Sequence, residues 1–389
     1  MAGPRPELSW PAANARRLAR HALGAPAPAA TGPAEIARAV CGAHAQVLSA
    51  AELSLALRIH GATRADVRRA LWEDRSLVKT YGPRGTVHLL PTGDLPMWTA
   101  ALSAIPAQSP FPDGVRLTPD QTEQVLGAIG TALAGAELTI DELGEAVVEL
   151  AGPWAGDRVM PAFQDLWPRW RQAVSTAAHR GVLCFGQNRG RRVTYTNPRR
   201  WLPGFRPAPE GGAIAGLLRR YLHAYGPATS RQFAQWIGAP PAWAADQFRR
   251  HRQELTEVDF EGTPAWVASG DAAPEAGVPA DGVLLLPYFD AFVVGSQPRD
   301  RLFPGGAADR ALAPSGQAGN FPVLLVDGEV AGVWHQRRSG GKIDITVEPL
   351  VSLTAGRRRA LEAQAGRIGE ILEGTPRLVV GTVTAGAHA

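Results

Sequence analysis

One order of local patterns occurs three times along this chain, and it constrains the fold more than any other feature. Helical stretches come first, and two strand-like runs around a glycine-containing turn follow them. The first occurrence has helical spacing over residues 14–23, 33–45, 49–59 and 64–74, then strand-like runs at 77–81 and 86–90. The turn Gly82-Pro83-Arg84-Gly85 carries an arginine near its tip. Helices followed by a basic-tipped hairpin are typical of a winged helix-turn-helix module.

The same order returns in the middle of the chain. The second occurrence has helical stretches at 118–133, 140–150 and 161–180 and strands at 182–185 and 191–196, and the third has helices at 212–225, 230–237 and 242–253 and strands at 255–260 and 265–268. The second turn is Gly186-Gln187-Asn188-Arg189-Gly190, whereas the third, Glu261-Gly262-Thr263-Pro264, is acidic and a poorer phosphate ligand. Because the intervals are irregular, we interpret these as recurring modules and not as a fixed-period solenoid.

Beyond a proline-rich linker at 271–279 the composition turns to strand. Strand-like runs occupy residues 283–286, 292–294, 323–326, 329–334 and 342–347. Asp327-Gly328 is the strongest short hairpin signal in the chain. A last helix over 356–372 places an apolar stripe on one face and ends at Gly374.

These patterns predict an α+β fold: three tandem winged helix-turn-helix modules followed by a C-terminal β-rich domain with a terminal helix. We expect an N-terminal tail and first module at 1–110, a second module at 111–206, a third at 207–270 and the β-rich domain at 271–389.

Composition and charge favour a soluble protein that binds an anionic partner. Hydrophobic residues make up 45% and charged residues 20% of the chain, and its net charge is +4. Lysine occurs only at positions 79 and 342, so arginine, which suits bidentate phosphate contacts, supplies most of the positive charge. A GC-rich genome would explain part of this bias.

Targeting and metal signals are lacking in the sequence. Cys41 and Cys184 lie far apart without metal-ligand spacing, which argues against a zinc site or disulfide framework. No run of 18 apolar residues or signal peptide is evident, so we expect a cytoplasmic protein, a monomer without cofactor, metal or membrane partner.

Chemistry is expected at Cys41-Gly42-Ala43-His44-Ala45-Gln46-Val47, between two helices. Where the backbone leaves helical geometry, His44 and Gln46 can converge on one water molecule. Histidine accepts a proton near neutral pH, and a glutamine amide orients water without ionising. The alternative is a helix end whose polar groups cap neighbouring carbonyls, with Ser49 as N-cap of the next helix.

Several cations are candidate phosphate ligands by their position in turns. They are Arg84 in the first wing, Arg189, Arg191 and Arg192 in the second, and Arg337, Arg338 and Lys342 around the loop Arg337-Arg338-Ser339-Gly340-Gly341. This last ribbon could lie in a groove of DNA or be a solvated turn. Asp290 could polarise a catalytic partner, but pairing with an arginine is favoured, and His88 is expected to pack in its strand.

Five stretches, in order along the chain, resemble bacterial winged-helix DNA glycosylases of the azinomycin-resistance type. They are His44-Ala45-Gln46 before Ser49-Ala50-Ala51, Arg84-Gly85-Thr86-Val87-His88-Leu89, Arg219-Arg220-Tyr221-Leu222 through Tyr225-Gly226-Pro227-Ala228-Thr229, Leu286-Pro287-Tyr288-Phe289-Asp290, and Asp327-Gly328 through Gly332-Val333-Trp334. In that family the first stretch is a glutamine, an apolar residue and a glutamine, or a variant with histidine first. This chain has the histidine form.

The resemblance implies excision of bulky N7-alkylated purines from double-stranded DNA, including interstrand crosslinks, in repair or antibiotic self-resistance. It implies that Gln46 orients the water, that His44 accepts its proton or helps to hold it, and that the 337–342 hairpin probes the duplex. Only Lys79 and Lys342 could form a Schiff base, and no apolar pocket is evident around either, so a monofunctional enzyme that leaves an abasic site is expected. The alternatives are a winged-helix transcription regulator without catalysis and a protein that sequesters a genotoxin.

Overall fold

The structure is a computed structural model, which describes residues 5–107, 109–162, 165–272 and 282–388. It contains small three-stranded sheets with helices, and one five-stranded sheet near the C-terminus. The linker expected at 271–279 lies mostly outside the described residues. No helix in the described part of the chain is long and apolar enough to cross a membrane.

The first unit is built around the sheet β2-β4-β3. Its elements are α2 (Pro33–Ala39), β2 (Ala43–His44), α3 (Leu48–Leu57), α4 (Arg64–Trp72), β3 (Leu77–Tyr81), β4 (Val87–Pro91) and α5 (Leu95–Ser103). β3 and β4 are antiparallel, with Leu77 opposite Pro91 and Tyr81 opposite Val87, as the turn between them predicts. Capping contacts between Thr63 and Asp66 begin α4.

The second unit has the sheet β5-β9-β8 and a separate hairpin, β6-β7. Its elements are α6 (Pro119–Leu133), β5 (Glu137–Thr139), α7 (Ile140–Ala151), β6 (Arg158–Pro161), β7 (Leu166–Pro168), α8 (Val174–His179), β8 (Cys184–Phe185) and β9 (Thr194–Thr196). The single helix expected over 161–180 is wrong. Pro161 and Pro168 end the two strands of the hairpin instead, and only the last third of the range is α-helical, since proline cannot supply an internal helix hydrogen bond.

The third unit has the sheet β1-β10-β11, so the N-terminal tail contributes a strand to it. Its elements are β1 (Glu7–Leu8), α1 (Trp10–Arg20), α9 (Glu210–Tyr225), α10 (Ser230–Ile237), α11 (Pro241–Arg250), β10 (Leu255–Phe260) and β11 (Thr263–Ala268). The acidic turn of its hairpin serves the fold, because Glu261 pairs with Arg301.

The C-terminal part is a five-stranded sheet in the order β12-β13-β14-β15-β16 with α15 alongside. Its elements are β12 (Val283–Leu286), α12 (Ala291–Gly295), α13 (Arg299–Leu302), α14 (Gly306–Ala311), β13 (Val323–Val326), β14 (Glu329–Ser339), β15 (Lys342–Pro349), α15 (Ala355–Ile371) and β16 (Thr375–Val380). The strand expected at 292–294 is wrong. The Asp290 side chain accepts a hydrogen bond from the Phe292 amide and so caps a short helix, α12.

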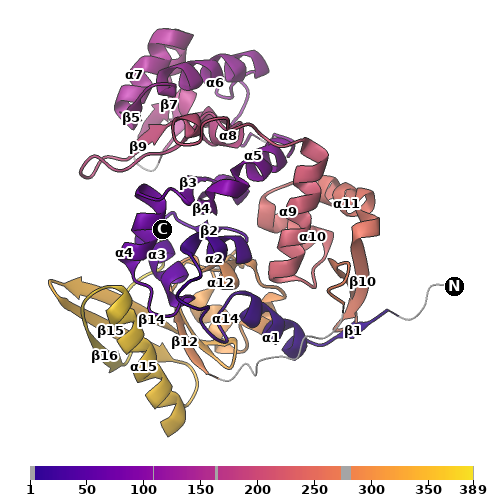
Figure 1. Cartoon of the computed structure of the whole chain (residues 1–389), viewed down its shortest axis with the longest axis vertical. Coiled ribbons are helices and arrows are strands. Elements are labelled where there is room, and N and C mark those ends of the chain that lie inside the picture. The colour runs from indigo at the N-terminus through magenta and orange to yellow at the C-terminus, as the bar shows by residue number, and fades with distance from the viewer. Residues whose placement is uncertain (1–4, 108, 163–164, 273–281, 389) are drawn as a thin grey trace.

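The first unit lies at the centre of the molecule (Figure 1). Its α5 packs against α8 of the second unit and α9 of the third, and its α3 packs against α15 of the C-terminal part. Its sheet separates two cores, because Leu77 and Leu89 pack in one and Val78 and Leu90 in the other. A side chain on this sheet can therefore contact residues from distant parts of the chain.

Candidate active site

The backbone between α2 and α3 reverses direction and then runs extended. Cys41 and Gly42 both have positive φ, 57° and 94°, which ends the helix at Ala39, earlier than the predicted residue 45. A Cβ on Gly42 would lie 2.9 Å from a methyl carbon of Leu90, so glycine is required by both conformation and space. α3 then begins at Leu48 with Val47 as its N-cap, so the prediction that Ser49 caps this helix is wrong.

His44 is the last residue of β2, and Gln46 follows two positions later at a bend. Ala43 and Ala45 enter the core, and His44 between them points to the other side. His44 lies opposite His88 in the sheet, and the Ala45 amide donates to the Val87 carbonyl at 2.7 Å. The exposed Gln46 continues the pairing with its side chain, because the Val87 amide donates to its Oε1 at 3.4 Å.

His44 is held between two rings. Its imidazole stacks on Phe289 with the ring centres 4.6 Å apart and meets His88 edge-on at 5.0 Å. Burial, assisted by the charges of Arg84 and His388, lowers the pKa of His44 to about 4. The imidazole is therefore neutral at physiological pH and able to accept a proton.

A cavity of about 360 Å³ opens beside His44. Its lining comes from the first unit, from α10 of the third unit, and from the segment around α12 and the loop after α14. The residues are His44, Arg84, Thr86, Gln232, Gln235, Trp236, Phe289, Val294, Gly295, Gln297, Arg299, Ser315, Gly316, Gln317 and Ala318. Three separate parts of the chain thus converge where the sequence places the candidate base.

The predicted cations have different surroundings. Arg84 lines the cavity, where its guanidinium donates to the Trp236 carbonyl, and the wing tip packs so closely on α10 that a Cβ on Gly238 would lie 2.9 Å from the Arg84 Cα. Arg189 forms an exposed ion pair with Glu142 of its own unit. Arg191 and Arg192 are exposed on the loop between β8 and β9. Arg84 and Arg189 therefore have partners in different units, the third and the second.

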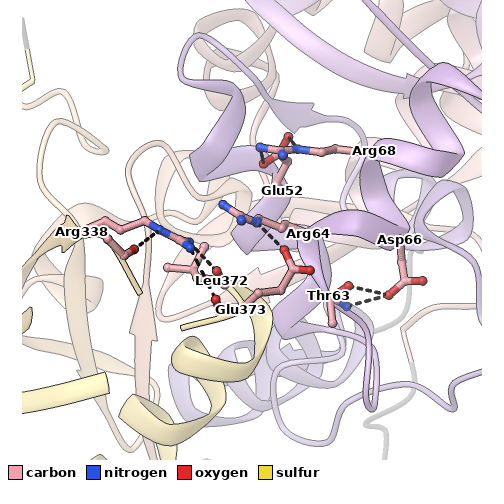
Figure 2. A network of polar contacts seen from close by, with 9 residues as sticks. Glu52, Thr63, Arg64, Asp66, Arg68, Arg338, Leu372 and Glu373 are labelled. Atoms are coloured by element: carbon pink, nitrogen blue, oxygen red, sulfur yellow. Dashed lines mark hydrogen bonds and ion pairs between the residues drawn. The ribbon is translucent and has the colours of Figure 1, made fainter. Parts of the chain in front are cut away.

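The β14-β15 hairpin is anchored close to its turn (Figure 2). Arg338 donates to the carbonyls of Leu372 and Glu373, at 2.6 Å and 3.4 Å, at the end of α15. The Glu373 carboxylate pairs in turn with Arg64 of α4 at 2.7 Å. Arg337 and Lys342 are exposed beside the two-residue turn. The hairpin is thus linked to the first unit through Glu373, and all three of its cations are exposed.

Asp290 and His88 take the structural roles that the sequence favours. Asp290 is fully buried and pairs through both oxygens with the equally buried Arg58, at 2.8 Å and 2.9 Å, and it accepts from Ser54. Burial opposes ionisation of Asp290, but the charge and hydrogen bonds of Arg58 outweigh it and lower its pKa. His88 is buried in β4 and its Nδ1 contacts the Thr86 carbonyl at 2.9 Å.

The expectation that Lys79 lacks an apolar environment is wrong. Its ammonium lies 4.5 Å from the Phe185 ring centre, and burial lowers its pKa. In the sheet, however, Lys79 lies opposite Leu89, whereas Thr80, the residue after Lys79, lies opposite His88. Lys79 and the His44–His88 pair therefore point to opposite faces, and Lys79 is not in the cavity lining.

Sequence reasoning missed most of the cavity wall. Phe289 belongs to the stretch Leu286-Pro287-Tyr288-Phe289-Asp290, but the sequence does not predict that it contacts His44. Gln235, Gln297 and Gln317 are scattered over 83 positions without a motif. Within the described ranges, no group of three or more histidine, cysteine or acidic side chains is placed to hold a metal ion.

The fold is similar to that of a solved DNA glycosylase. It matches the solved structure of the Streptomyces sahachiroi DNA glycosylase AlkZ with a TM-score of 0.78 and 28% identity, over 96% of this chain and 100% of that one. The interstrand DNA cross-link repair glycosylase of Streptomyces sahachiroi is 34% identical over 313 residues, which are 76% of this chain and 80% of that protein. A family model described as DNA glycosylase AlkZ-like matches residues 37–371.

The chain therefore belongs to the AlkZ-like DNA glycosylase family. This confirms the predicted family and the predicted glycosylase activity, and it argues against a transcription regulator without catalysis.

Proposed function

We propose that this DNA glycosylase hydrolyses the N-glycosidic bond of bulky N7-alkylated purines in double-stranded DNA, interstrand crosslinks included, with His44 and Gln46 as its catalytic pair. The observation that carries the proposal is a neutral imidazole in the wall of a cavity, two residues before an exposed glutamine that lies outside the described lining. The name of the relative as a cross-link repair glycosylase supports the substrate class.

The chemistry needs little acid catalysis. Alkylation at N7 makes the purine cationic, so the C1′–N9 bonding electrons can leave with the base, which departs neutral. Gln46 holds a water molecule below C1′ as the cationic sugar develops. The oxygen of this water forms the new bond to C1′. His44 accepts the proton that this water loses. The products are the free modified base and an abasic site.

A monofunctional reaction fits the positions of the two lysines. A lyase step requires an amine that attacks C1′. Lys79 points to the opposite face of the sheet from His44, and Lys342 lies at the turn of the β14-β15 hairpin. Water is therefore the better nucleophile in this cavity.

For DNA binding, we propose that the three helical units are winged helix-turn-helix modules, followed by the β-rich domain at 271–389. The first lies within 1–110, without β1 and α1, which belong to the third unit, and the other two lie at 111–206 and 207–270. Each has helices beside a small sheet with a hairpin. The exposed Arg191, Arg192, Arg337 and Lys342 are the best-placed phosphate ligands. Arg84, Arg189 and Arg338 would have to give up or share their present partners.

The test is excision from a duplex that carries one N7-alkylguanine. Gln46→Ala should lower the rate of base release by at least about 100-fold, the range typical for lost positioning of a reactant, while the melting temperature changes little because Gln46 is exposed. Gln253→Ala, a change at another exposed glutamine, is the matched control. Normal release by Gln46→Ala would remove Gln46 from the mechanism, and stoichiometric protection without turnover would indicate sequestration.

A further inference from the structure

Four glutamine side chains line the cavity beside His44. Gln232 and Gln235 come from α10, Gln297 precedes α13, and Gln317 lies in the loop after α14. We propose that this cavity binds the substituent on the alkylated base, and that it selects an uncharged group that combines an aromatic ring with amide, carbonyl or hydroxyl groups. The proposal rests on the proposed function and names its substrate more closely.

The charges around the cavity favour a neutral substituent. Among the described lining residues none is acidic, and Arg84 and Arg299 are the cations. Arg299 donates to the carbonyls of Val293 and Ser296, at 2.6 Å and 2.7 Å, and Arg84 donates to the Trp236 carbonyl. Their positive charge repels a cationic substituent. Their N–H groups already donate to backbone carbonyls, so fewer of them remain to bind an anionic substituent.

The amides are available to a ligand. Gln235 and Gln317 are exposed, and neither side chain has a hydrogen-bond partner among the described residues. The Oε1 of Gln232 accepts from the Thr229 amide at 2.8 Å, which leaves its NH₂ group to donate. Each free amide supplies both a donor and an acceptor without carrying charge. The wall therefore matches neutral polar groups on a ligand.

Two aromatic rings complete the wall. Phe289 stacks on His44 and has a positive φ of 54°, a conformation that side-chain-bearing residues rarely adopt. It is held there because its amide donates to the Gly319 carbonyl at 2.9 Å and because a Cβ on Gly319 would come within 3.0 Å of its ring. Trp236 lies on the α10 side. His44 covers one face of Phe289, and Trp236 is only 8% exposed because it packs on other rings, so these two residues add a small apolar surface against which an aromatic group can pack.

Size and position agree with this assignment. A volume of about 360 Å³ lies in the range of small-molecule sites, about 300–1,000 Å³, and far exceeds what a methyl group fills. Since His44 and the four glutamines line the same cavity, a base whose sugar lies at His44 can place its N7 substituent against the amides. The same site can thus cleave the N-glycosidic bond and select among N7 substituents.

The experiment compares duplexes that carry N7-guanine adducts of three kinds: methyl, a benzamide on a short alkyl chain, and a hydrocarbon of the same size without polar atoms. For the wild type we expect kcat/KM to be about 10-fold higher for the benzamide than for the hydrocarbon, since each hydrogen bond contributes about 3- to 10-fold. The double change Gln235→Ala and Gln317→Ala should bring this ratio close to one. Gln124→Ala, at an exposed glutamine on α6, is the matched control and should leave the ratio unchanged.

A second variant keeps the test informative if the double change lowers stability. Gln317→Glu places a carboxylate in the wall and should shift preference toward an adduct with a terminal ammonium group by at least about 3-fold. A wild-type enzyme that releases the benzamide and hydrocarbon bases equally well, or a preference that survives the double change, overturns the cavity assignment while the glycosylase reaction stands. Failure to release any of the three bases would instead overturn the proposed function.

Discussion

Replacing His44 by glutamine tests whether the histidine removes a proton. Glutamine keeps a polar group that can orient water, and it matches the first residue in the other form of the family motif, but it cannot accept a proton. A positioned general base contributes typically about 10²- to 10⁴-fold to the rate. Because the departing base is already cationic, we expect His44→Gln to lower kcat/KM by about 100-fold, the low end of that range.

The pH dependence of kcat/KM provides a second, independent test of His44 as the base. With a pKa of about 4, His44 is about 0.1% protonated at pH 7 and about 10% protonated at pH 5, so wild-type kcat/KM should be nearly flat between pH 5.5 and 8. A histidine with its ordinary pKa of 6.5 would instead halve the activity near pH 6.5. The low pKa follows from burial against Phe289 and His88.

The assay is single-turnover release of an N7-alkylguanine from a duplex, corrected at each pH for spontaneous depurination. Circular dichroism at each pH identifies the range in which the protein stays folded. The reasoning is refuted if His44→Gln stays within twofold of the wild type, or if wild-type activity halves near pH 6.5. In the first case His44 helps only to hold the water.

Three further predictions concern stability and DNA binding. Asp290→Asn should lower the free energy of unfolding by about 3–5 kcal/mol in a denaturant titration, because it leaves Arg58 charged and buried, whereas Glu123→Gln at an exposed pair should change it by less than about 1 kcal/mol. Arg337→Ala and Lys342→Ala should each weaken DNA binding and reduce the slope of log K against log salt by about 1, and unchanged slopes would place the hairpin away from phosphates. The free energy of unfolding should be highest above pH 6.5 and fall as the pH drops from 6.5 to 4, because over this range only the unfolded chain takes up a proton at His44. This residue alone accounts for a loss of roughly 3 kcal/mol. Unfolding free energies that do not change between pH 6.5 and 4 would contradict the burial argument.

Much of the fold can be predicted from local sequence. The hairpin strands at 77–81 and 255–260 and the helix at 230–237 occur where their patterns place them. The two helix predictions that are wrong fail at a proline or at a residue with positive φ. Proline breaks the range 161–180 into a hairpin and a short helix, and the positive φ of Cys41 ends α2 early.

For the candidate site, the sequence by itself determined which residues could do chemistry: a histidine and a glutamine two apart, next to a glycine that turns the chain out of a helix. Only the tertiary structure decided that the His44 imidazole is neutral, because its pKa depends on burial against a ring 245 positions away. The glutamine-lined cavity was likewise decided by packing among three distant segments. Periodicity and turn chemistry act between near neighbours, whereas burial, pKa and cavity shape arise from contacts between residues that the sequence keeps far apart.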